Sequence, residues 1–376
     1  MQLDSDAVTA LHAIGWPGDG PAAMAGWREV LQAHPQARPA RVIEQHRSGY
    51  VVADGVGDGF AAESPPEWQR APGYRKGTTA VEQRAAVGDW VLLEGKRIVA
   101  LLPRRTAIKR GAAGEHYKQQ VIAANIDTVL VVCGLDGDFN ARRIERYLLL
   151  VQGGAAQAAP AAVVVLTKAD QEGAEASAAL AELAAVAGQD VPVFAVNAKD
   201  GESVAVLAPW LRPGMTAVLV GSSGAGKSTL TNTLLGMDRM KTGAVREHDA
   251  RGRHTTTYRA LIPLPSGACL IDTPGMRELK PTGEEDLGEG GFADIEALAE
   301  QCRFRDCRHE REPGCAVRAA IEAGTLDPAR LANYLKLRDE VAGAADRLAT
   351  RLTQKAHAKV QGKALNKRLD EKYGKH

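Results

Sequence analysis

A phosphate-binding loop is the clearest chemical signal in the sequence. Residues 221–229 read GSSGAGKST, which matches G-x-x-x-x-G-K-[ST] between the apolar run Ala217–Val220 and a helix-like segment. Such glycines let backbone N–H groups face phosphate oxygens, the lysine neutralises the β- and γ-phosphates, and the serine hydroxyl binds Mg²⁺. The alternative is a glycine-rich turn with an incidental Lys-Ser pair. The predicted nucleotide-binding residues are Gly221, Ser222, Ser223, Gly224, Ala225, Gly226, Lys227, Ser228 and Thr229.

A candidate magnesium carboxylate and a candidate switch follow the loop. Asp272 ends the apolar run Ala268–Ile271 and begins Asp-Thr-Pro-Gly, so its carboxylate can join Ser228 around Mg²⁺, and the Gly275 N–H can sense a γ-phosphate. Between the motifs, a His-Thr-Thr-Thr stretch offers hydroxyls that can close onto Mg²⁺ as a GTPase switch does. The alternative is a β-prone loop. The predicted catalytic residues are His254, Thr255, Thr256, Asp272 and Gly275.

The attacking water has no glutamine to orient it. Met276 directly follows Asp-Thr-Pro-Gly, where many GTPases have Gln, and a thioether cannot orient water. His254 is the nearest polar substitute. We therefore expect slow intrinsic turnover and strong stimulation by a partner that orders the switch. The alternative is that His254 only packs or contacts RNA.

The candidate base-reading segments precede the phosphate loop. Thr167-Lys168-Ala169-Asp170 matches [NT]-K-x-D after an apolar run, and its carboxylate would accept from guanine N1–H and the exocyclic amine. Asn197-Ala198-Lys199, after a second run, is placed to contact guanine O6. The alternative is an unrelated Lys-x-Asp turn. The order of motifs is therefore permuted, which a fold tolerates when its original termini lie close together at the surface.

A Cys/His cluster predicts a structural metal site. Its spacing is C-x₄-C-x-H-x₅-C, and three thiolates with one imidazole form a closed tetrahedral set suited to zinc. The alternative is a group of buried free thiols. The predicted zinc ligands are Cys302, Cys307, His309 and Cys315. Four arginines that could contact phosphates lie among the ligands: Arg303, Arg305, Arg308 and Arg311. The alternative is that they form a solvated face with Asp306, Glu310 and Glu312 as ionic partners.

Two other stretches carry one-sided positive charge. The segment Leu102–Lys118 has five basic residues against Glu115, which is typical of a linker with a basic face. In the tail, basic residues recur at four-residue intervals and would form a stripe along a helix, which favours RNA contact over a solvated or frayed terminus. The stripe consists of Arg351, Lys355, Lys359, Lys363 and Lys367.

Composition bounds the class of protein. A chain of 376 residues, 45% hydrophobic and 25% charged, is long enough for two or three globular domains. A net charge of +1 excludes nucleic-acid binding through net charge alone. No apolar run is long enough to span a membrane, and the acidic N-terminus is unlike a secretory signal. Five cysteines, three of them clustered, fit a reducing cytosol better than a disulfide framework, so we expect a cytoplasmic protein.

Five regions should position these residues. We expect a variable extension over 1–40, with weakly helical character. Short strands between glycine-rich turns predict a small β-barrel or sandwich over 41–107. Strands alternating with helices predict an α/β, doubly wound parallel sheet over 118–280. A helical region with the Cys/His cluster follows over 281–350, and 351–376 is the basic tail.

Together, these motifs resemble the RsgA family of circularly permuted, small-ribosomal-subunit-dependent GTPases, over about residues 40–345. The resemblance implies an OB-fold, a circularly permuted P-loop GTPase domain and a mostly helical zinc-binding domain. It also implies that a monomer hydrolyses GTP to GDP and phosphate with Mg²⁺, contacts rRNA, and assists late maturation of the small subunit, which stimulates it.

The chain departs from the family pattern at two positions. Thr167 replaces the usual Asn, which we expect to weaken a contact with the phosphate loop, and Asn197 replaces the usual Ser. The alternative function is an RNA-binding scaffold in which nucleotide only tunes binding and hydrolysis is incidental. A P-loop ATPase or small-molecule kinase fits poorly because it predicts no base reader like Asp170.

Overall fold

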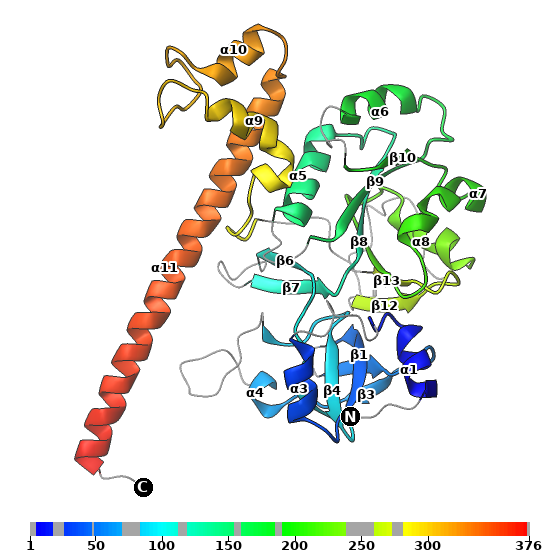
Figure 1. Cartoon of the computed structure of the whole chain (residues 1–376), viewed down its shortest axis with the longest axis vertical. Coiled ribbons are helices and arrows are strands. Elements are labelled where there is room, and N and C mark those ends of the chain that lie inside the picture. The colour runs from blue at the N-terminus through cyan, green and yellow to red at the C-terminus, as the bar shows by residue number, and fades with distance from the viewer. Residues whose placement is uncertain are drawn as a thin grey trace, which may run out of the picture.

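One mixed sheet runs through the molecule and joins an α/β half to a ring of short strands (Figure 1). The structure is a computed structural model. It describes residues 5–17, 26–46, 49–69, 83–111, 119–153, 159–184, 190–237, 259–272 and 281–373.

The α/β half contains the predicted parallel sheet. Five parallel strands run in the order β10-β9-β8-β11-β13, and β12 adds antiparallel to β13. The carboxyl ends of the parallel strands therefore meet at one edge, where such sheets bind ligands. The bounds are β8 Thr128–Gly134, β9 Ala161–Thr167, β10 Val193–Ala195, β11 Thr216–Val220, β12 Arg259–Pro263 and β13 Cys269–Asp272.

Helices cover both faces of this sheet because side chains alternate along its buried strands. On β8, Val129 and Val131 belong to one apolar core, whereas Leu130 and Val132 belong to the other. The first core is covered by α5 (Ala141–Gln152) and α6 (Ala176–Ala184). The second is covered by α7 (Gly201–Val204), the 3₁₀ helix η2 (Ala205–Trp210) and α8 (Lys227–Leu235).

The ring of short strands occupies the region where a small barrel or sandwich is expected. Antiparallel pairs link β3 to β2, β2 to β1, β1 to β4 and β4 to β5. A parallel bridge between Glu63 and Arg97 joins the end of β3 to β5, so the strands close on themselves. The bounds are β1 Arg38–Gln45, β2 Tyr50–Ala53, β3 Phe60–Ala62, β4 Trp90–Glu94 and β5 Arg97–Leu101, with the short helix α4 at Pro66–Gln69.

The N-terminal segment supplies core side chains, although the sequence suggested only a variable, weakly helical extension. It contains α1 (Ser5–His12) and α3 (Trp27–Ala33). Trp16 and Trp27 are buried, and the Trp16 ring packs edge-on against Trp90 of β4 with 4.7 Å between centroids. The segment is therefore part of the packed structure.

The expected basic linker is a hairpin whose charges are largely used within the molecule. Strand β6 (Ala107–Gly111) pairs antiparallel with β7 (Gln119–Ala124). Three basic side chains of this segment form ion pairs: Arg104 with the buried Asp89 at 2.7 Å, Arg105 with Asp127 at 3.3 Å, and Lys109 with Glu284 at 2.8 Å. The expectation of a free basic face is wrong for these three residues.

The C-terminal region packs against α5. Phe292, Val317 and Tyr334 share an apolar core with Leu149 of α5. Arg330, 6% exposed, joins the region to α5 by an ion pair with the buried Glu145. The elements are the π-helical turn η3 (Gly288–Phe292), α9 (Ala293–Ala299), α10 (Ala316–Glu322) and α11 (Pro328–Tyr373).

Helix α11 continues through most of the basic tail and extends along one side of the molecule (Figure 1). Its backbone is helical to Tyr373, as the four-residue spacing predicts. Within the described ranges, neither this helix nor any other combines the length and apolar character that crossing a membrane requires.

A fully buried arginine joins the N-terminal segment, the ring and the α/β half. The Arg41 guanidinium, on β1, donates to the carbonyl oxygens of Ile14, Gly88 (3.3 Å) and Asn125 (3.3 Å), and to the Thr216 hydroxyl (2.9 Å). Burial lowers its pKa below the usual arginine value. Because a buried charge is costly unless it is hydrogen-bonded, these contacts determine how the three parts fit together.

Replacing Arg41 should therefore destabilise the whole protein. Arg41→Met leaves several buried acceptors without a donor, and we expect a loss of about 3–5 kcal/mol in the free energy of unfolding. The matched control is Arg38→Met on the same strand, because Arg38 is half exposed, pairs with the exposed Asp54 and lies over the Phe60 ring; it should cost about 1 kcal/mol or less. Denaturant unfolding measures both, and equal midpoints would contradict the role of Arg41.

Candidate functional site

The phosphate loop lies between β11 and α8, as the sequence predicts. Gly221 has φ +145°, and a Cβ there would lie 2.1 Å from the carbonyl oxygen of Val132 on the neighbouring β8. Gly226, at φ +89°, precedes the first residue of α8. The loop can thus turn sharply beside β8, while Ser223 and Gly224 remain exposed at its tip.

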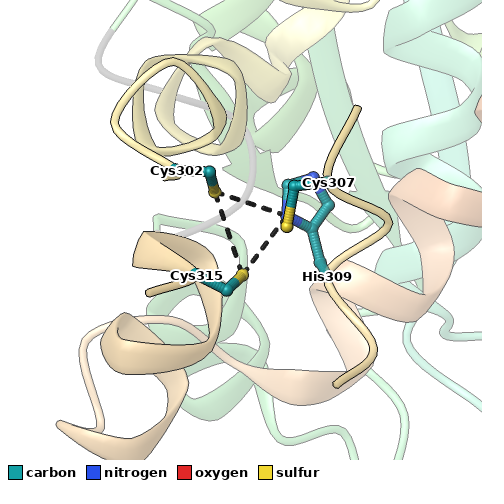
Figure 2. Close-up of side chains that lie close together, drawn as sticks. All are labelled: Cys302, Cys307, His309 and Cys315. Carbon is teal, nitrogen blue, oxygen red and sulfur yellow. Dashed lines mark hydrogen bonds between the residues drawn. The ribbon is translucent and has the colours of Figure 1, made fainter. Parts of the chain in front are cut away.

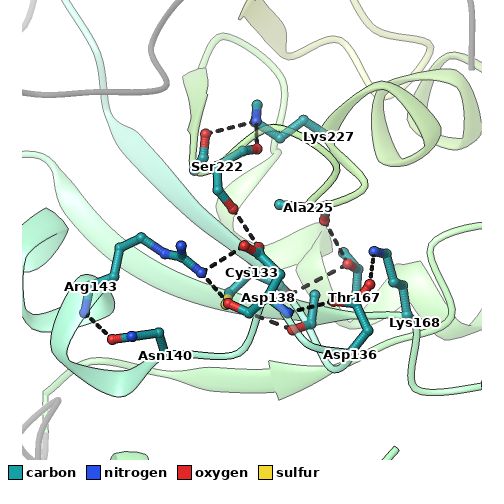
Figure 3. A network of polar contacts seen from close by, with 12 residues as sticks. Cys133, Asp136, Asp138, Asn140, Arg143, Thr167, Lys168, Ser222, Ala225 and Lys227 are labelled. Carbon is teal, nitrogen blue, oxygen red and sulfur yellow. Dashed lines mark hydrogen bonds and ion pairs between the residues drawn. The ribbon is translucent and has the colours of Figure 1, made fainter. Parts of the chain in front are cut away.

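The cationic and magnesium-binding candidates lie around this loop. Lys227 Nζ donates to the carbonyl oxygens of Gly221 (2.8 Å) and Ser222, which holds the ammonium group over the loop (Figure 3). Ser228 follows in the first turn of α8. Asp272 ends β13, which pairs directly with β11, so its carboxylate is one strand away from the loop.

The base-reading motif is attached to the phosphate loop through Thr167. This residue ends β9, and its hydroxyl donates to the Ala225 carbonyl at 2.6 Å. Threonine therefore makes one hydrogen bond to the phosphate loop, and the expectation that it weakens this contact relative to asparagine stays a prediction. Lys168 follows with φ +63°, and Ala169 and the exposed Asp170 complete the motif.

The second base segment is fixed to the helix that follows the phosphate loop. Thr233 of α8 donates to the Ala198 carbonyl at 2.6 Å, and the Asn197 side chain accepts from Lys199 N–H at 3.0 Å. The fold thus brings three predicted segments, far apart in the chain, to one edge of the sheet.

Two carboxylates that the sequence analysis did not single out also reach this edge (Figure 3). Asp136 pairs with Lys168, and Asp138 accepts from the Ser222 hydroxyl. Partial burial would raise the pKa of Asp136, but the Lys168 ammonium and the Asp138 N–H hold it below its usual value. The signal was available, since an Asp-x-Asp directly after a buried strand lies where the carboxyl ends of parallel strands gather.

The four predicted metal ligands converge in the C-terminal region (Figure 2). Their ligand atoms all lie within 4.8 Å of one another. Burial lowers the pKa of His309, which favours the neutral imidazole that binds metals. Cys315 caps α10 and its sulfur accepts from the Arg318 N–H at 3.4 Å, which fits a thiolate. The residues Cys302, Cys307, His309 and Cys315 can therefore hold one metal ion.

The arginine-bearing loop between these ligands is folded by an acid. Glu312 accepts from the backbone N–H groups of Arg308, Glu310 and Arg311 at 3.0–3.1 Å. These hydrogen bonds lower the pKa of Glu312 to about 2. Glu312, expected in the alternative reading as an ionic partner of the arginines, shapes the backbone of the loop instead.

Four predicted catalytic residues lie outside the part of the chain that the structure describes. They are His254, Thr255, Thr256 and Gly275.

Comparison with known proteins gives consistent relatives. Residues 101–282 match the RsgA GTPase family. The chain is 70% identical over 363 residues, 96% of its length and 97% of the relative's, to the small ribosomal subunit biogenesis GTPase RsgA of Xanthomonas axonopodis pv. citri (strain 306). It is also 70% identical over 353 residues, 94% of each chain, to the protein with the same name from Xanthomonas euvesicatoria pv. vesicatoria (strain 85-10).

Solved structures share the fold. YjeQ from Thermotoga maritima superposes with a TM-score of 0.57 at 23% identity, over 82% of this chain and 99% of that one. YloQ, described as a circularly permuted GTPase, gives a TM-score of 0.52 at 24% identity, over 84% and 97% of the two chains. The fold is therefore that of the circularly permuted GTPases.

The close approach at Gly221 generates a prediction. Gly221→Ala places a methyl group against the Val132 backbone at a φ that alanine rarely adopts. The loop must therefore shift, and its N–H groups no longer point at the phosphate oxygens. We expect loss of guanine-nucleotide binding and a decrease of about 2 kcal/mol or more in the free energy of unfolding. Gly201→Ala, in open space at the start of α7, should change stability by less than about 1 kcal/mol and spare binding. Titration with a fluorescent guanine nucleotide tests both variants, and unchanged binding by Gly221→Ala would refute the argument.

Proposed function

The chain belongs to the RsgA GTPase family, and from this premise we propose that it binds the small ribosomal subunit and assists its late maturation in the cytoplasm, hydrolysing GTP with stimulation by the subunit. The observation that carries the proposal is 70% identity over 96% of the chain to a small ribosomal subunit biogenesis GTPase. The permuted order of motifs on one sheet edge supports the same chemistry independently of that name.

GTP occupies the carboxyl edge of the parallel sheet in this proposal. Asp170 accepts from the guanine N1–H and amino groups, the Lys168 stem lies along the base, and residues 197–199 face O6. The phosphate loop and Lys227 hold the phosphates. Support comes from the hydrogen bond of Thr167 to the phosphate loop and that of Thr233 to residue 198, since these contacts hold the three segments together.

The hydroxyl of Ser228 and the carboxylate of Asp272 would hold a magnesium ion. Hard oxygen ligands from one hydroxyl and one carboxylate, completed by phosphates and water, are what Mg²⁺ prefers in such sites. The ion would supply positive charge to the oxygens around the reacting phosphate. The pairing of β13 with β11 supports this assignment because Asp272 ends β13, and Ser228 lies in the first turn of α8, directly after the loop that follows the adjacent strand β11.

Hydrolysis depends on the switch in this proposal. Thr255 and Thr256 close towards the magnesium, the Gly275 N–H meets the γ-phosphate, and His254 orients the attacking water in place of the missing glutamine at Met276. The support here is chemical and comes from the sequence alone.

The ring of short strands is proposed to be an OB-fold that contacts rRNA. Its strand pairing, with β1 bonded to both β2 and β4 and with β3 joined to β5, is the arrangement expected of a five-stranded OB barrel. OB-folds bind oligonucleotides across strands 2 and 3 and the adjoining loops. A cavity of about 710 Å³ lies there, lined by residues that include His46, Tyr50, Lys96 and Arg97. Cationic side chains along such a cavity suit the phosphates of single-stranded RNA.

The metal ion is proposed to be structural zinc. A tetrahedron with Zn–S bonds of about 2.3 Å and Zn–N bonds of about 2.0–2.1 Å has S–S edges of about 3.8 Å and S–N edges of about 3.5 Å. The structure has 3.8 Å between the Cys302 and Cys315 sulfurs, and His309 Nδ1 lies 3.7 Å from the Cys302 sulfur and 3.4 Å from the Cys315 sulfur. Four protein ligands leave no open position for catalysis, so zinc would only hold the arginine-bearing loop in shape.

The experiment that tests the function is a GTPase assay with and without purified small subunits. The subunit should stimulate hydrolysis strongly, and ATP should not replace GTP because adenine offers no donor pair to Asp170.

His254→Ala should lower the stimulated rate by about a hundredfold while sparing GTP binding. Removing residues 351–376 should weaken subunit binding and flatten its salt dependence, because fewer phosphates are neutralised. Absence of stimulation would favour an RNA-binding scaffold with incidental hydrolysis.

Zinc should be present at about one ion per chain in freshly purified protein. Cys307→Ser should reduce that content and unfold the C-terminal region, yet leave GTP binding nearly intact, because the ligands pack in a different apolar core from the phosphate loop. Cys269→Ala, which alters a buried cysteine of the sheet, is the matched control and should keep the metal. Elemental analysis and proteolysis of the C-terminal region give the readouts, and wild-type protein with well under one zinc would contradict the assignment.

A further inference from the structure

The loop between β8 and α5 contacts both halves of the nucleotide site. It spans residues 135–140, and none of the motif segments includes it. Asp136 pairs with Lys168 on the base side, and Asp138 accepts from the Ser222 hydroxyl on the phosphate side (Figure 3). The loop therefore touches one residue of each motif through a carboxylate.

Hydrogen bonds hold this loop at both ends. Leu135 N–H donates to the Thr167 carbonyl at 2.9 Å, which ties the loop to the end of β9. The Asp138 N–H donates to the Asp136 carboxylate at 3.1 Å. At the far end, Asn140 caps α5 by accepting from the Arg143 N–H at 2.9 Å. A loop anchored at both ends can hold its two carboxylates in place.

A cation offsets the charge of the second carboxylate. The Arg143 guanidinium lies 2.7 Å from Asp138 Oδ1, and both side chains are partly buried. A carboxylate that touches the phosphate loop would repel a bound nucleotide, because charges interact over about 10 Å at 0.1 M ionic strength. Arg143 removes most of that repulsion while Asp138 still accepts from Ser222.

We propose that Asp136 and Asp138 are positioning residues for GTP: Asp136 orients Lys168 for the base, and Asp138, neutralised by Arg143, orients Ser222 and the phosphate loop. The proposal requires only that the chain binds and hydrolyses GTP. It does not depend on the ribosomal role.

The base side is tested with Asp136→Ala. Lys168 then has no fixed direction, so the affinities for GTP and GDP should fall by the same factor, about tenfold, with the intrinsic single-turnover rate unchanged. Asp54→Asn, which removes an exposed ion pair on the ring of strands, should leave both affinities and the rate as they are. Wild-type affinity in Asp136→Ala would overturn this half of the proposal.

The phosphate side is tested with Arg143→Gln, which leaves the Asp138 charge uncompensated. Affinity should fall more for GTP than for GDP, since GTP carries the additional charge, and the loss should shrink as salt rises. Adding Asp138→Asn to Arg143→Gln should restore much of the GTP affinity, because the amide oxygen still accepts from Ser222. Equal losses for the two nucleotides, or no recovery in the double variant, would indicate only a structural role and overturn this half. A wild-type protein that fails to bind GTP would instead refute the GTP site itself.

Discussion

The buried guanidinium of Arg41 is the constraint on which the arrangement of the molecule depends. A cation with no exposed surface must find acceptors for its N–H groups, and it finds them on the N-terminal segment, on the turn at Gly88, before β8 and at the start of β11. The neighbouring Gly15 has no room for a larger residue, because it has φ +90° and a Cβ there would lie 2.4 Å from the Arg41 side chain. The ring and the α/β sheet are therefore held in one relative position.

The sheet edge that carries the predicted nucleotide-binding segments depends on this relative position and on close backbone packing. Parallel strands bring the ends of β8, β9 and β11 together, and the glycine at position 221 lets the phosphate loop pass within contact of β8. Short side chains then connect the loops: the Thr167 hydroxyl reaches the Ala225 carbonyl and donates a hydrogen bond to it. The site is thus assembled by contacts between loops that follow neighbouring strands.

The sequence predicted what depends on local pattern. The phosphate loop, the parallel strands, the permuted order and the convergence of the four Cys/His ligands follow from spacing and apolar runs, and the structure agrees. The sequence could not predict the contacts whose partners are distant in the chain. The ion pair of Arg104 with Asp89 makes an apparently basic linker part of the packed structure, and Trp16 is buried because Trp27 and Trp90 pack against it. Asp136 and Asp138 could be placed at the sheet edge from the sequence, but their contacts with Lys168 and Ser222 are visible only once β8, β9 and β11 are adjacent.

The pairing of β1 with β12 has a consequence for the order in which the protein is made. Glu44 and Gln45 pair with Ala260 and Arg259, so this end of β1 lacks its neighbour until most of the chain has been synthesised. The rest of that edge pairs with β4, which emerges much sooner. One acceptor of Arg41, the Thr216 hydroxyl, likewise emerges long after Arg41 itself. A strand end that lacks its partner during this interval invites wrong pairing. Because contacts so distant in sequence form slowly, the fold is completed late in translation, when β11, which precedes the predicted phosphate loop, and β13, which ends at Asp272, emerge.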